Sequence, residues 1–448
     1  MKTIVKGREN TIKLLGELQP EHTNYRLMNY TLCSECDDGT LLYNVITGQL
    51  VLLNDEESAL IKRLPSALQD AMIELINHRF IVPVDYDEKN TVLKLRLLLQ
   101  QLFPSKGING YTILPTTNCN ARCFYCYENN FSHINMSKEV ANQLVEYMIS
   151  HKGKGPLRLS WFGGEPLLGR DRIEQICRSL RNHGIEYVSS MVTNGYLFTK
   201  EIAEQAVRDW NVKTVQITID GTEQVYNYTK SYVTAVDSPY QRVMRNIHML
   251  LEMGFNVSIR LNLDKHNEND LINLMNELAD RFAGFENIDV YVHTLFENEG
   301  YSPIPRDEES RKSLYKRQVE FNCYLEENGL KKRHLYLPSL RVTCCTADAQ
   351  NTACVYPDGH LFKCEHTGLA AAYGHINSNE LDETNKKKFQ ARTEFEQCWK
   401  CPLYPSCILL KECYGLNDHN RITCEHKVES HIQVLPVMYR NKISKTAE

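Results

Sequence analysis

Three cysteines stand close together in the first third of the chain, at Cys119, Cys123 and Cys126. They directly follow an apolar run that we expect to form a strand, so all three thiols lie on one short loop. Three thiolates can hold three irons of a [4Fe–4S] cluster and leave the fourth iron open to bind a small molecule. A zinc site needs a fourth ligand that this loop does not supply. The loop therefore predicts an iron–sulfur cluster, with a zinc site or three buried cysteines as the alternatives.

The CxxxCxxC spacing of these cysteines resembles the motif of the radical S-adenosylmethionine (SAM) superfamily. In this family the amino and carboxylate groups of SAM bind the open iron. The resemblance covers about residues 108–430 and implies that an external flavodoxin- or ferredoxin-like donor supplies an electron to the cluster. SAM would then be cleaved to methionine and a 5′-deoxyadenosyl radical, which removes a hydrogen from the substrate.

A second motif, Gly163, Gly164 and Glu165, ends the next predicted strand and resembles the family's GGE motif. Glycine permits another group to approach the backbone closely. The carboxylate of Glu165 can accept a hydrogen bond from the SAM amine. A Gly-Gly-Glu sequence on its own is more often a turn. Its position one strand–helix unit after the cysteines favours the functional interpretation.

Polar residues near later strand ends extend the resemblance. Asn194 follows the third predicted strand and Thr218 lies at the end of the fourth, where the superfamily lines its cofactor site. The resemblance implies that Thr218 contacts SAM and that Tyr125, just before the last cysteine of the loop, lies near the adenine. A plain turn at the strand end is the alternative.

Arg260 and Asn262 stand two positions apart on the fifth predicted strand and therefore share a face. They are candidates for contacts with the ribose or the carboxylate of SAM, and a solvated barrel rim is the alternative. Relatives often carry an arginine after the fourth strand, where this chain has Lys230. Lysine keeps the charge but cannot bind a carboxylate through a two-pronged fork, so Lys230 matches the family only in part.

Nine further cysteines lie between residues 344 and 424. Their GxxxxC and CxxC-x5-C elements resemble the SPASM extension of radical SAM peptide-modifying enzymes and sulfatase maturases, which binds two auxiliary [4Fe–4S] clusters. The resemblance implies one cluster on Cys345, Cys354, Cys364 and Cys413, and another on Cys398, Cys401, Cys407 and Cys424. A pair of zinc knuckles is the alternative.

Two details of this region stay open. Cys344 could replace its neighbour Cys345, and five residues separate Cys407 from Cys413 where the family usually has three. Full ligation by four cysteines favours electron transfer or a structural role, because no iron is left open. If the longer spacing displaces one ligand, a substrate thiolate could take its place.

Glu365 directly follows Cys364, at the position where sulfatase maturases tend to carry an aspartate thought to deprotonate the substrate. A desolvated carboxylate beside a cluster could serve as a general base. A solvated turn residue is the alternative. The Cys33 and Cys36 pair in the leading part of the chain is half a metal site, and we interpret it as incidental.

The elements that must position these residues alternate between strand and helix, which is typical of parallel βα units. Candidate strands are 111–115, 157–161, 186–192, 214–219, 256–261 and 288–293, with helices near 137–151, 169–183, 199–208, 238–252 and 268–282. Six units predict an α/β fold with a partial (β/α)6 barrel and ligands at the C-terminal strand ends. The resemblance implies that this is the radical SAM barrel, over residues 106–335. Residues 336–448 would be the SPASM domain.

The order of elements expected in residues 1–105 indicates a separate winged-helix-like domain. A hairpin over 40–46 and 49–53 leads into a helix capped at Asn54, then a helix over 66–78 and a strand near 80–84. Radical SAM peptide maturases use such a domain to hold a leader peptide. Strand addition at a sheet edge would bind an extended leader through backbone hydrogen bonds.

Composition limits the remaining choices. The chain has 448 residues, 51 Lys and Arg against 56 Asp and Glu, and 16 cysteines. Mild acidity without a basic run argues against nucleic-acid binding, and no apolar stretch reaches the roughly 20 residues that span a bilayer. The charged first ten residues do not resemble a signal peptide. We therefore expect a cytoplasmic protein that uses cysteine for metal ligation.

These features together predict a radical SAM maturase similar to sactisynthases and ranthipeptide synthases. It would install cross-links in a ribosomally synthesised precursor peptide that carries a leader, with a thioether between a cysteine sulfur and an acceptor carbon preferred. Formylglycine formation by an anaerobic sulfatase maturase and carbon–carbon cyclisation are alternatives. Outside this class, a winged-helix regulator whose iron–sulfur clusters sense redox state is the rival.

Overall fold

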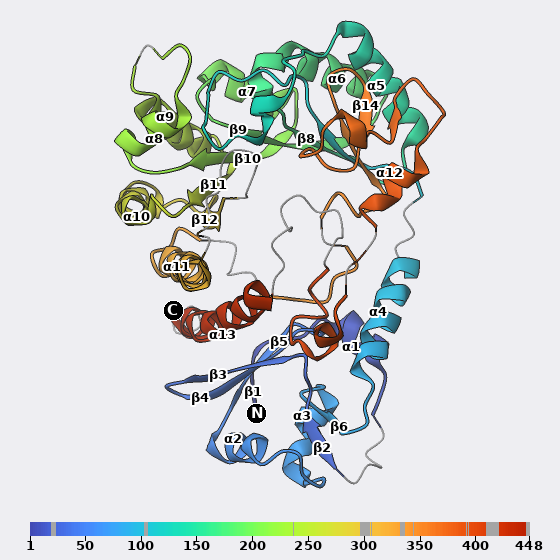
Figure 1. Ribbon diagram of the computed structural model, residues 1–448, viewed down its shortest axis with the longest axis vertical. Helices are drawn as coiled ribbons and strands as arrows, with labels where there is room; N and C mark the ends of the chain where they lie inside the picture. Colours follow the sequence, from blue (N-terminus) through green and yellow to red (C-terminus); the bar gives the residue numbers. More distant parts are fainter. Residues whose placement is uncertain are drawn as a thin grey trace.

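The computed structural model describes residues 1–18, 24–102, 106–235, 237–295, 305, 307–331, 337–343, 345–390, 392, 394–408 and 421–444. Figure 1 shows one lobe built around the strands β7 to β12 and another around β1 and β3 to β5, with helix α13 between them.

Six parallel strands form the sheet that carries the candidate site. They lie in the order β12-β11-β10-β9-β8-β7, so each strand neighbours the next one in sequence. Their bounds are β7 Gly110–Ile113, β8 Leu157–Trp161, β9 Tyr187–Thr193, β10 Val212–Ile219, β11 Asn256–Leu263 and β12 Ile288–Thr294. Strand–helix–strand crossovers of one hand produce such an order. The predicted partial barrel is confirmed.

Helices cover the outer face of this sheet (Figure 1). Ser137, Thr199 and Ser238 begin α5, α7 and α9, since each side chain accepts a hydrogen bond from a backbone N–H three residues on. Between the helices and the sheet lies the largest hydrophobic core, in which Trp161 and Trp210 are fully buried. The helices are α5 Lys138–His151, α6 Arg170–Asn182, α7 Lys200–Arg208, α8 Glu223–Lys230, α9 Pro239–Glu252 and α10 Glu268–Phe282.

The inner face of the sheet is polar, because alternate residues of each strand point away from the core. The parallel register places Thr218 beside Arg260 and Arg260 beside Tyr291. It also places Asn262 beside His293. Polar side chains from three neighbouring strands therefore share one face near the C-terminal strand ends.

Three short strands from the cysteine-rich region extend the same sheet. β13 Thr352–Val355 pairs with β7 in parallel, and β14 His360–Phe362 and β15 Gly374–His375 follow antiparallel. The register sets Cys354 beside Thr112 of β7. Periodicity did not predict these strands, because each is only two to four residues long.

The N-terminal region forms an antiparallel sheet in the order β1-β5-β4-β3. The predicted hairpin is β4 Gly39–Asn44 and β5 Gln49–Leu53, flanked by β1 Lys2–Val5 and β3 Thr31–Cys36. The predicted helix start is also present: α2 Asp55–Lys62 begins with a capping box in which Asn54 and Glu57 bind each other's backbone N–H.

The helix predicted over 66–78 is shorter than expected. Ser66 exchanges two backbone hydrogen bonds with Tyr25, of 2.8 and 3.1 Å, so its backbone is extended. A 3-10 turn over Asp70–Met72 then leads into α3 Ile73–Asn77. The strand predicted near 80–84 is β6 Ile81–Pro83, which pairs with β2 Tyr25–Leu27.

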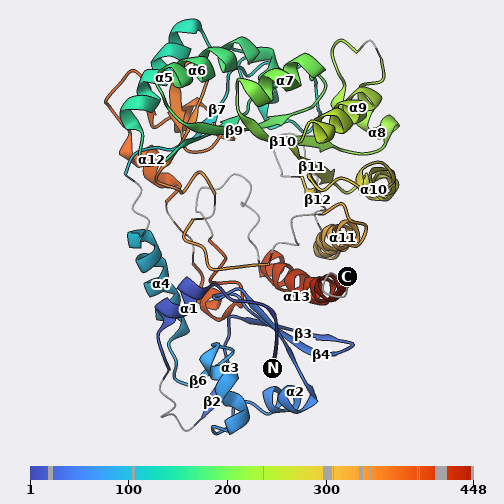
Figure 2. The ribbon, with the colours of Figure 1, turned by 180° about the vertical axis from the view of Figure 1, so that it is seen from behind.

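Two long helices, α4 and α13, lie where the two lobes meet. α4 Glu88–Leu102 leaves the N-terminal lobe, and α13 Arg421–Ser444 lies between α11 Glu308–Glu327 and β3 in both ribbon views (Figure 2). Leu435 and Tyr439 of α13 share a hydrophobic cluster with Leu32 of β3. Two short helices, α1 Glu9–Leu15 and α12 Glu383–Lys388, complete the described α-helices.

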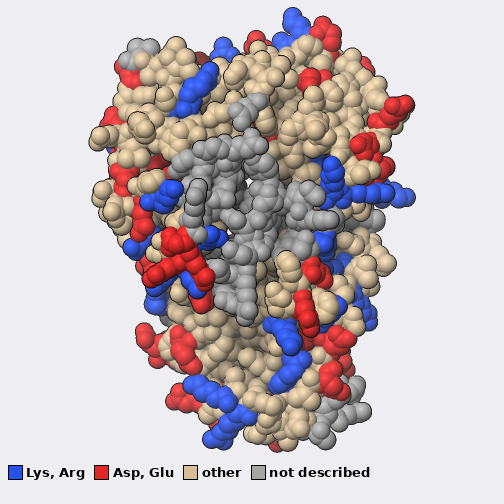
Figure 3. All heavy atoms as spheres, viewed as in Figure 1, with Lys and Arg blue, Asp and Glu red and all other residues tan. Residues whose placement is uncertain are grey.

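Charged side chains of both signs are interspersed on the face shown in Figure 3. Among the described residues, no helix combines the length and apolar character needed to cross a bilayer.

Candidate active site

The cysteine loop begins where β7 ends. The Thr117 hydroxyl fixes its base by donating to the backbone oxygen of Ser132 at 2.6 Å. Burial, with smaller contributions from the charges of nearby Glu165 and Glu128 and of Cys123, raises the pKa of the Cys119 and Cys126 thiols to about 12. Metal binding displaces such protons. Three neighbouring, partly buried thiols on one loop fit an iron–sulfur cluster with an open iron.

Gly163 and Gly164 lie directly against this loop. A Cβ atom at Gly164 would clash with the backbone oxygen of Asn118 and stand 2.7 Å from that of Thr117. Gly163 has a φ of +111°, and a Cβ atom there would clash with the backbone oxygen of Thr116. The close backbone approach expected from the glycines is thus made to the cysteine loop itself.

Replacing Gly164 with alanine is expected to displace the cysteine loop. Relieving such an overlap typically costs about 1–3 kcal/mol, so we expect the rate of SAM cleavage to fall by about tenfold or more. Gly284→Ala is the matched control, because no atom lies within 4 Å of a Cβ atom at that glycine. Equal iron content and SAM cleavage in the two variants would contradict the importance of this contact.

Glu165 is fully buried and joins the ends of two strands. Its Oε1 accepts hydrogen bonds from Leu167 N at 3.1 Å and the Thr193 hydroxyl at 2.8 Å. Its Oε2 accepts one from Asn194 N at 2.9 Å. Burial raises the pKa of Glu165 to about 7. The carboxylate therefore orients the ends of β8 and β9, and its contact with the SAM amine remains a prediction.

Asn194 reaches from the end of β9 to the cysteine loop. Its side-chain N–H donates to Asn120 Oδ1 at 2.7 Å and lies 4.0 Å from the Cys119 sulfur. Asn194 therefore lies beside the first cysteine, and its role in lining the cofactor site remains a prediction.

A buried polar network forms around Asp220, just after β10. Lys230 Nζ lies 2.9 Å from Asp220 Oδ2, and the two side chains are 4% and 3% exposed. Lys230 and Asn262 donate to the Tyr125 hydroxyl at 2.9 and 3.2 Å, and that hydroxyl lies 2.9 Å from Asp220 Oδ1. Burial opposes the lysine charge, but the Asp220 carboxylate raises the pKa of Lys230 above its usual value. Three residues predicted from the sequence thus meet at one aspartate.

Arg260 extends this network across the inner face of the sheet. Its Nε donates to Asn262 Oδ1 at 2.8 Å, and its terminal nitrogen lies 3.4 Å from His293 Nδ1. Burial lowers the pKa of His293 to about 4, so this imidazole is neutral near pH 7. Thr218 stands beside Arg260 in the register. These side chains form a polar wall on the inner face of the sheet near the C-terminal strand ends, and Asn262 joins it to Tyr125 of the cysteine loop.

A comparison with known protein families identifies the domain that carries these residues. Residues 113–278 match the family model described as the radical SAM superfamily. The chain contains a radical SAM domain. The match starts at the last residue of β7, includes the three cysteines, and ends within α10. The sequence-based identification of a radical SAM domain is confirmed.

Curated relatives that match part of this chain have different named activities. GTP 3′,8-cyclase of Rhodopirellula baltica is 29% identical over 153 residues, which are 33% of this chain and 40% of the relative. Fe-coproporphyrin III synthase of Methanosarcina barkeri is 24% identical over 208 residues, 44% of this chain and 48% of the relative. The radical SAM cyclopropyl synthase TigE of Paramaledivibacter caminithermalis is 23% identical over 256 residues, 49% and 52%. The chain thus spans about half the length of the curated relatives it matches.

Solved structures match a larger part of this chain than the curated relatives do. anSMEcpe with bound AdoMet has a TM-score of 0.58 and 16% identity, covering 75% of this chain and 99% of that chain. SuiB of Streptococcus suis bound to S-adenosylmethionine has a TM-score of 0.52 and 15% identity, covering 87% of this chain and 95% of that chain. Both similarities concern the fold.

Glu365 lies where the radical SAM domain meets the cysteine-rich region. The ring of the following residue, His366, is 4.1 Å from the ring of Tyr127, which comes directly after the cysteine loop. Burial and the neighbouring Glu365 carboxylate raise the pKa of Glu128 to about 8. The candidate base therefore lies within electrostatic reach of the radical SAM loop.

The C-terminal cysteines gather in two places. Cys354 and Cys364 are close enough for one thiolate to raise the pKa of the other, although burial is the larger cause for Cys354. Burial lowers the pKa of Lys363, the residue before Cys364, to about 8, and the negative charge of the Cys345 thiolate opposes this shift. Cys413 and Cys344 lie outside the described residues.

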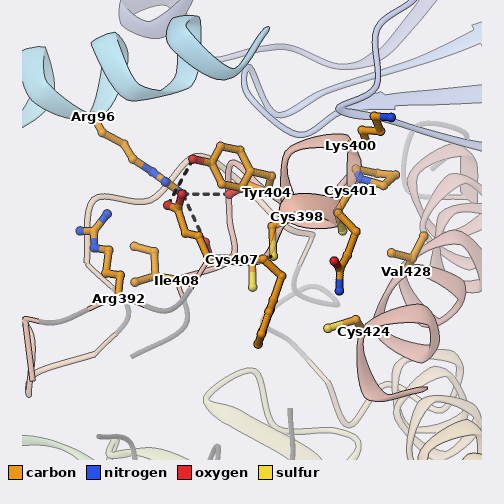
Figure 4. Close-up of a pocket in the computed structure, with 14 residues that line it drawn as sticks. Arg96, Arg392, Cys398, Lys400, Cys401, Tyr404, Cys407, Ile408, Cys424 and Val428 are labelled. Carbon is orange, nitrogen blue, oxygen red and sulfur yellow. Dashed lines mark hydrogen bonds between the residues drawn. The ribbon is translucent and has the colours of Figure 1, made fainter. Parts of the chain in front are cut away.

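The second group, Cys398, Cys401, Cys407 and Cys424, lines one cavity of about 290 Å³ (Figure 4). In the described part of the chain, no group of three or more Cys, His, Asp or Glu side chains is arranged to hold a single metal ion. A four-thiolate donor set fits a closed [4Fe–4S] cluster. The number of auxiliary clusters remains a prediction.

Two residues of the site were not among the candidates chosen from the sequence. Asp220 stands in the Thr218-Ile219-Asp220 segment, and its carboxylate at a strand end was the available signal. Glu128 is 8% exposed, and its Oε1 has no hydrogen-bond partner among the described residues. Its position two residues after Cys126 was the only sequence signal.

Proposed function

We propose that the chain is a radical SAM maturase that cross-links a ribosomally synthesised precursor peptide. The observation that carries the proposal is the arrangement of three parts: an N-terminal antiparallel sheet, a radical SAM domain and a cysteine-rich region with two groups of thiols. In this proposal residues 1–105 bind the leader, 106–335 form the barrel and 336–448 form a SPASM domain. We place the protein in the cytoplasm, with a flavodoxin- or ferredoxin-like electron donor.

The structural relatives support a peptide substrate. SuiB bound to precursor peptide SuiA covers 87% of this chain with a TM-score of 0.50. anSMEcpe bound to the Cp18Cys peptide covers 75% with a TM-score of 0.56. The wider coverage by SuiB favours a precursor peptide over a sulfatase. The GTP 3′,8-cyclase similarity is confined to about a third of the chain.

Each part of the site has a role in this proposal. The residues Cys119, Cys123 and Cys126 would hold the cluster. Tyr125 of the cysteine loop and Asn262 of the polar wall would orient SAM. When bound, SAM and the cluster supply the hydrogen-abstracting chemistry. In this proposal the polar wall and the cysteine loop would exclude water from the reacting atoms.

A thioether is the cross-link that we propose. Its formation joins a cysteine sulfur to an acceptor carbon and removes one hydrogen from each. When bound, SAM would supply a 5′-deoxyadenosyl radical, released with methionine when one electron from the external donor breaks its C–S bond, and this radical would accept the hydrogen atom of the acceptor carbon. Glu365 would accept the thiol proton, and the C-terminal cysteines would hold the iron–sulfur cluster that accepts the remaining electron. The peptide is thus oxidised by two electrons for each cross-link.

The proposal is tested by co-expressing this protein anaerobically with a cysteine-containing precursor peptide encoded beside its gene. High-resolution mass spectrometry should show the loss of two hydrogens for each cross-link, and a thiol-alkylating reagent should no longer modify the cross-linked cysteine. The same peptide without its leader should remain mostly unmodified. The Glu365→Gln variant tests the proposed base and should form the product more slowly.

The alternatives give different results. Loss of two hydrogens with free thiols would indicate a carbon–carbon cross-link. An unchanged peptide, with SAM still cleaved, would overturn the substrate and favour formylglycine formation on a sulfatase. Absence of SAM cleavage would favour an iron–sulfur redox sensor.

A further inference from the structure

We propose that Arg96 is a positioning residue that sets the shape of the loop carrying Cys398, Cys401 and Cys407. Arg96 lies on α4, in the helix that leaves the N-terminal lobe, and is 4% exposed. The inference rests on the proposed function only in treating these cysteines as iron ligands.

The guanidinium group of Arg96 donates four hydrogen bonds to backbone oxygens. Its Nε binds Arg341 at 3.1 Å. One terminal nitrogen binds Tyr404 at 2.8 Å, Cys407 at 3.2 Å and Pro405 at 3.3 Å. A single side chain therefore holds two segments that are more than sixty residues apart in sequence.

These four acceptors are neutral carbonyl groups, so Arg96 contacts the loop through hydrogen bonds and not through an ion pair. Residues 402–406 form turns and belong to no strand or helix. Buried carbonyl oxygens outside regular structure need donors from elsewhere. Arginine offers five N–H groups in a rigid planar fork, whereas the lysine ammonium is a compact point charge on a flexible stem.

Cys407 connects this hydrogen-bond set to the cavity. Its backbone oxygen binds Arg96, while its side chain lines the cavity of about 290 Å³ together with Cys398, Cys401 and Cys424 (Figure 4). Cys407 is thus held by its backbone on one side and presents its thiol on the other. A shift of the turn would move this thiol relative to the other three.

Two more residues of the N-terminal lobe hold the opposite end of the same loop. The Tyr30 hydroxyl donates to the backbone oxygen of Trp399 at 3.1 Å. Lys89 Nζ lies 3.2 Å from the centre of the Trp399 ring. Trp399 directly follows Cys398, so the N-terminal lobe contacts the loop beside its first and its last cysteine.

The test measures iron at these cysteines without using catalysis. In full-length protein with Cys119, Cys123 and Cys126 replaced by alanine, the remaining iron belongs to the C-terminal cysteines. Adding Arg96→Lys should remove about four irons per chain, the content of one [4Fe–4S] cluster. The electron paramagnetic resonance spectrum of the reduced protein should lose the matching signal. Arg96→Met should behave like Arg96→Lys.

Arg79→Lys is the matched control. Arg79 is 3% exposed and also donates to backbone oxygens, those of Ile76 and Gly16, but these lie within the N-terminal lobe. This variant should keep its iron. Circular dichroism of each variant checks folding, and Tyr30→Phe, which removes one hydrogen bond, serves if the arginine variants do not fold.

Tyr30→Phe should then alter the resonance signal of the same cluster. Unchanged iron and an unchanged spectrum in the variants that fold would overturn the proposal. Equal iron loss in the Arg79 and Arg96 variants would also overturn it, as would absence of iron from these cysteines in the parent protein. No peptide enters these measurements, so a failed peptide assay would contradict the proposed function alone.

Discussion

Replacing Cys123 with alanine is expected to remove the iron–sulfur cluster of the radical SAM domain and to abolish SAM cleavage. Two thiolates cannot hold the three irons that the loop would bind, so the site for SAM is lost with the cluster. Iron and sulfide analysis should show about four fewer irons per chain. Production of methionine and 5′-deoxyadenosine under anaerobic, reducing conditions should fall to that of a reaction without protein.

Cys177→Ala is the control for the loss of one thiol. Cys177 is fully buried on α6, within the hydrophobic core behind the sheet. Its loss should lower stability by less than about 2 kcal/mol and leave iron content unchanged. SAM cleavage by Cys123→Ala at the rate of the parent protein would contradict the assignment of the loop.

Replacing Lys230 with methionine is expected to destabilise the domain by about 3–5 kcal/mol. The substitution leaves the Asp220 carboxylate, which is almost fully buried, without its ion-pair partner. Urea unfolding of the iron-free protein measures the change. Lys62→Met is the matched control, because the Lys62–Glu35 pair is 68% and 62% exposed and should contribute less than about 1 kcal/mol.

The double variant Asp220→Asn with Lys230→Met separates the ion pair from its surroundings. Removing both charges leaves no uncompensated charge in the core, so the double variant should lose less stability than the sum of the two single variants. Additive losses, or a loss below about 1 kcal/mol for Lys230→Met alone, would show that the pair behaves like a surface contact.

Local sequence patterns were sufficient to predict many strands and helices of the barrel. The strand predicted over 157–161 is β8 Leu157–Trp161, and the helix predicted over 268–282 is α10 Glu268–Phe282. Apolar residues at strand or helix spacing mark the buried side of each element, and nearby residues determine that spacing. The capping box at Asn54 and Glu57 was predictable for the same reason, because its two partners are three residues apart.

Other elements could not be predicted from local patterns. α13 Arg421–Ser444 has only a weak amphipathic pattern and contains Pro436, and its position depends on packing against α11 and β3. The short strands β13 to β15 form because β7 offers them a free edge. A two- to four-residue strand has too little periodicity to be recognised before its partner is known.

The amino-acid sequence by itself determined the ligand loop of this protein: Cys119, Cys123 and Cys126 lie within eight residues, so any compact conformation keeps them together. Tertiary structure decided what surrounds that loop. Tyr125 and Asn262 are 137 residues apart, and Arg96 and Cys407 are 311 residues apart, yet each pair is hydrogen-bonded. Such contacts depend on how the whole core packs, and no local spacing encodes them.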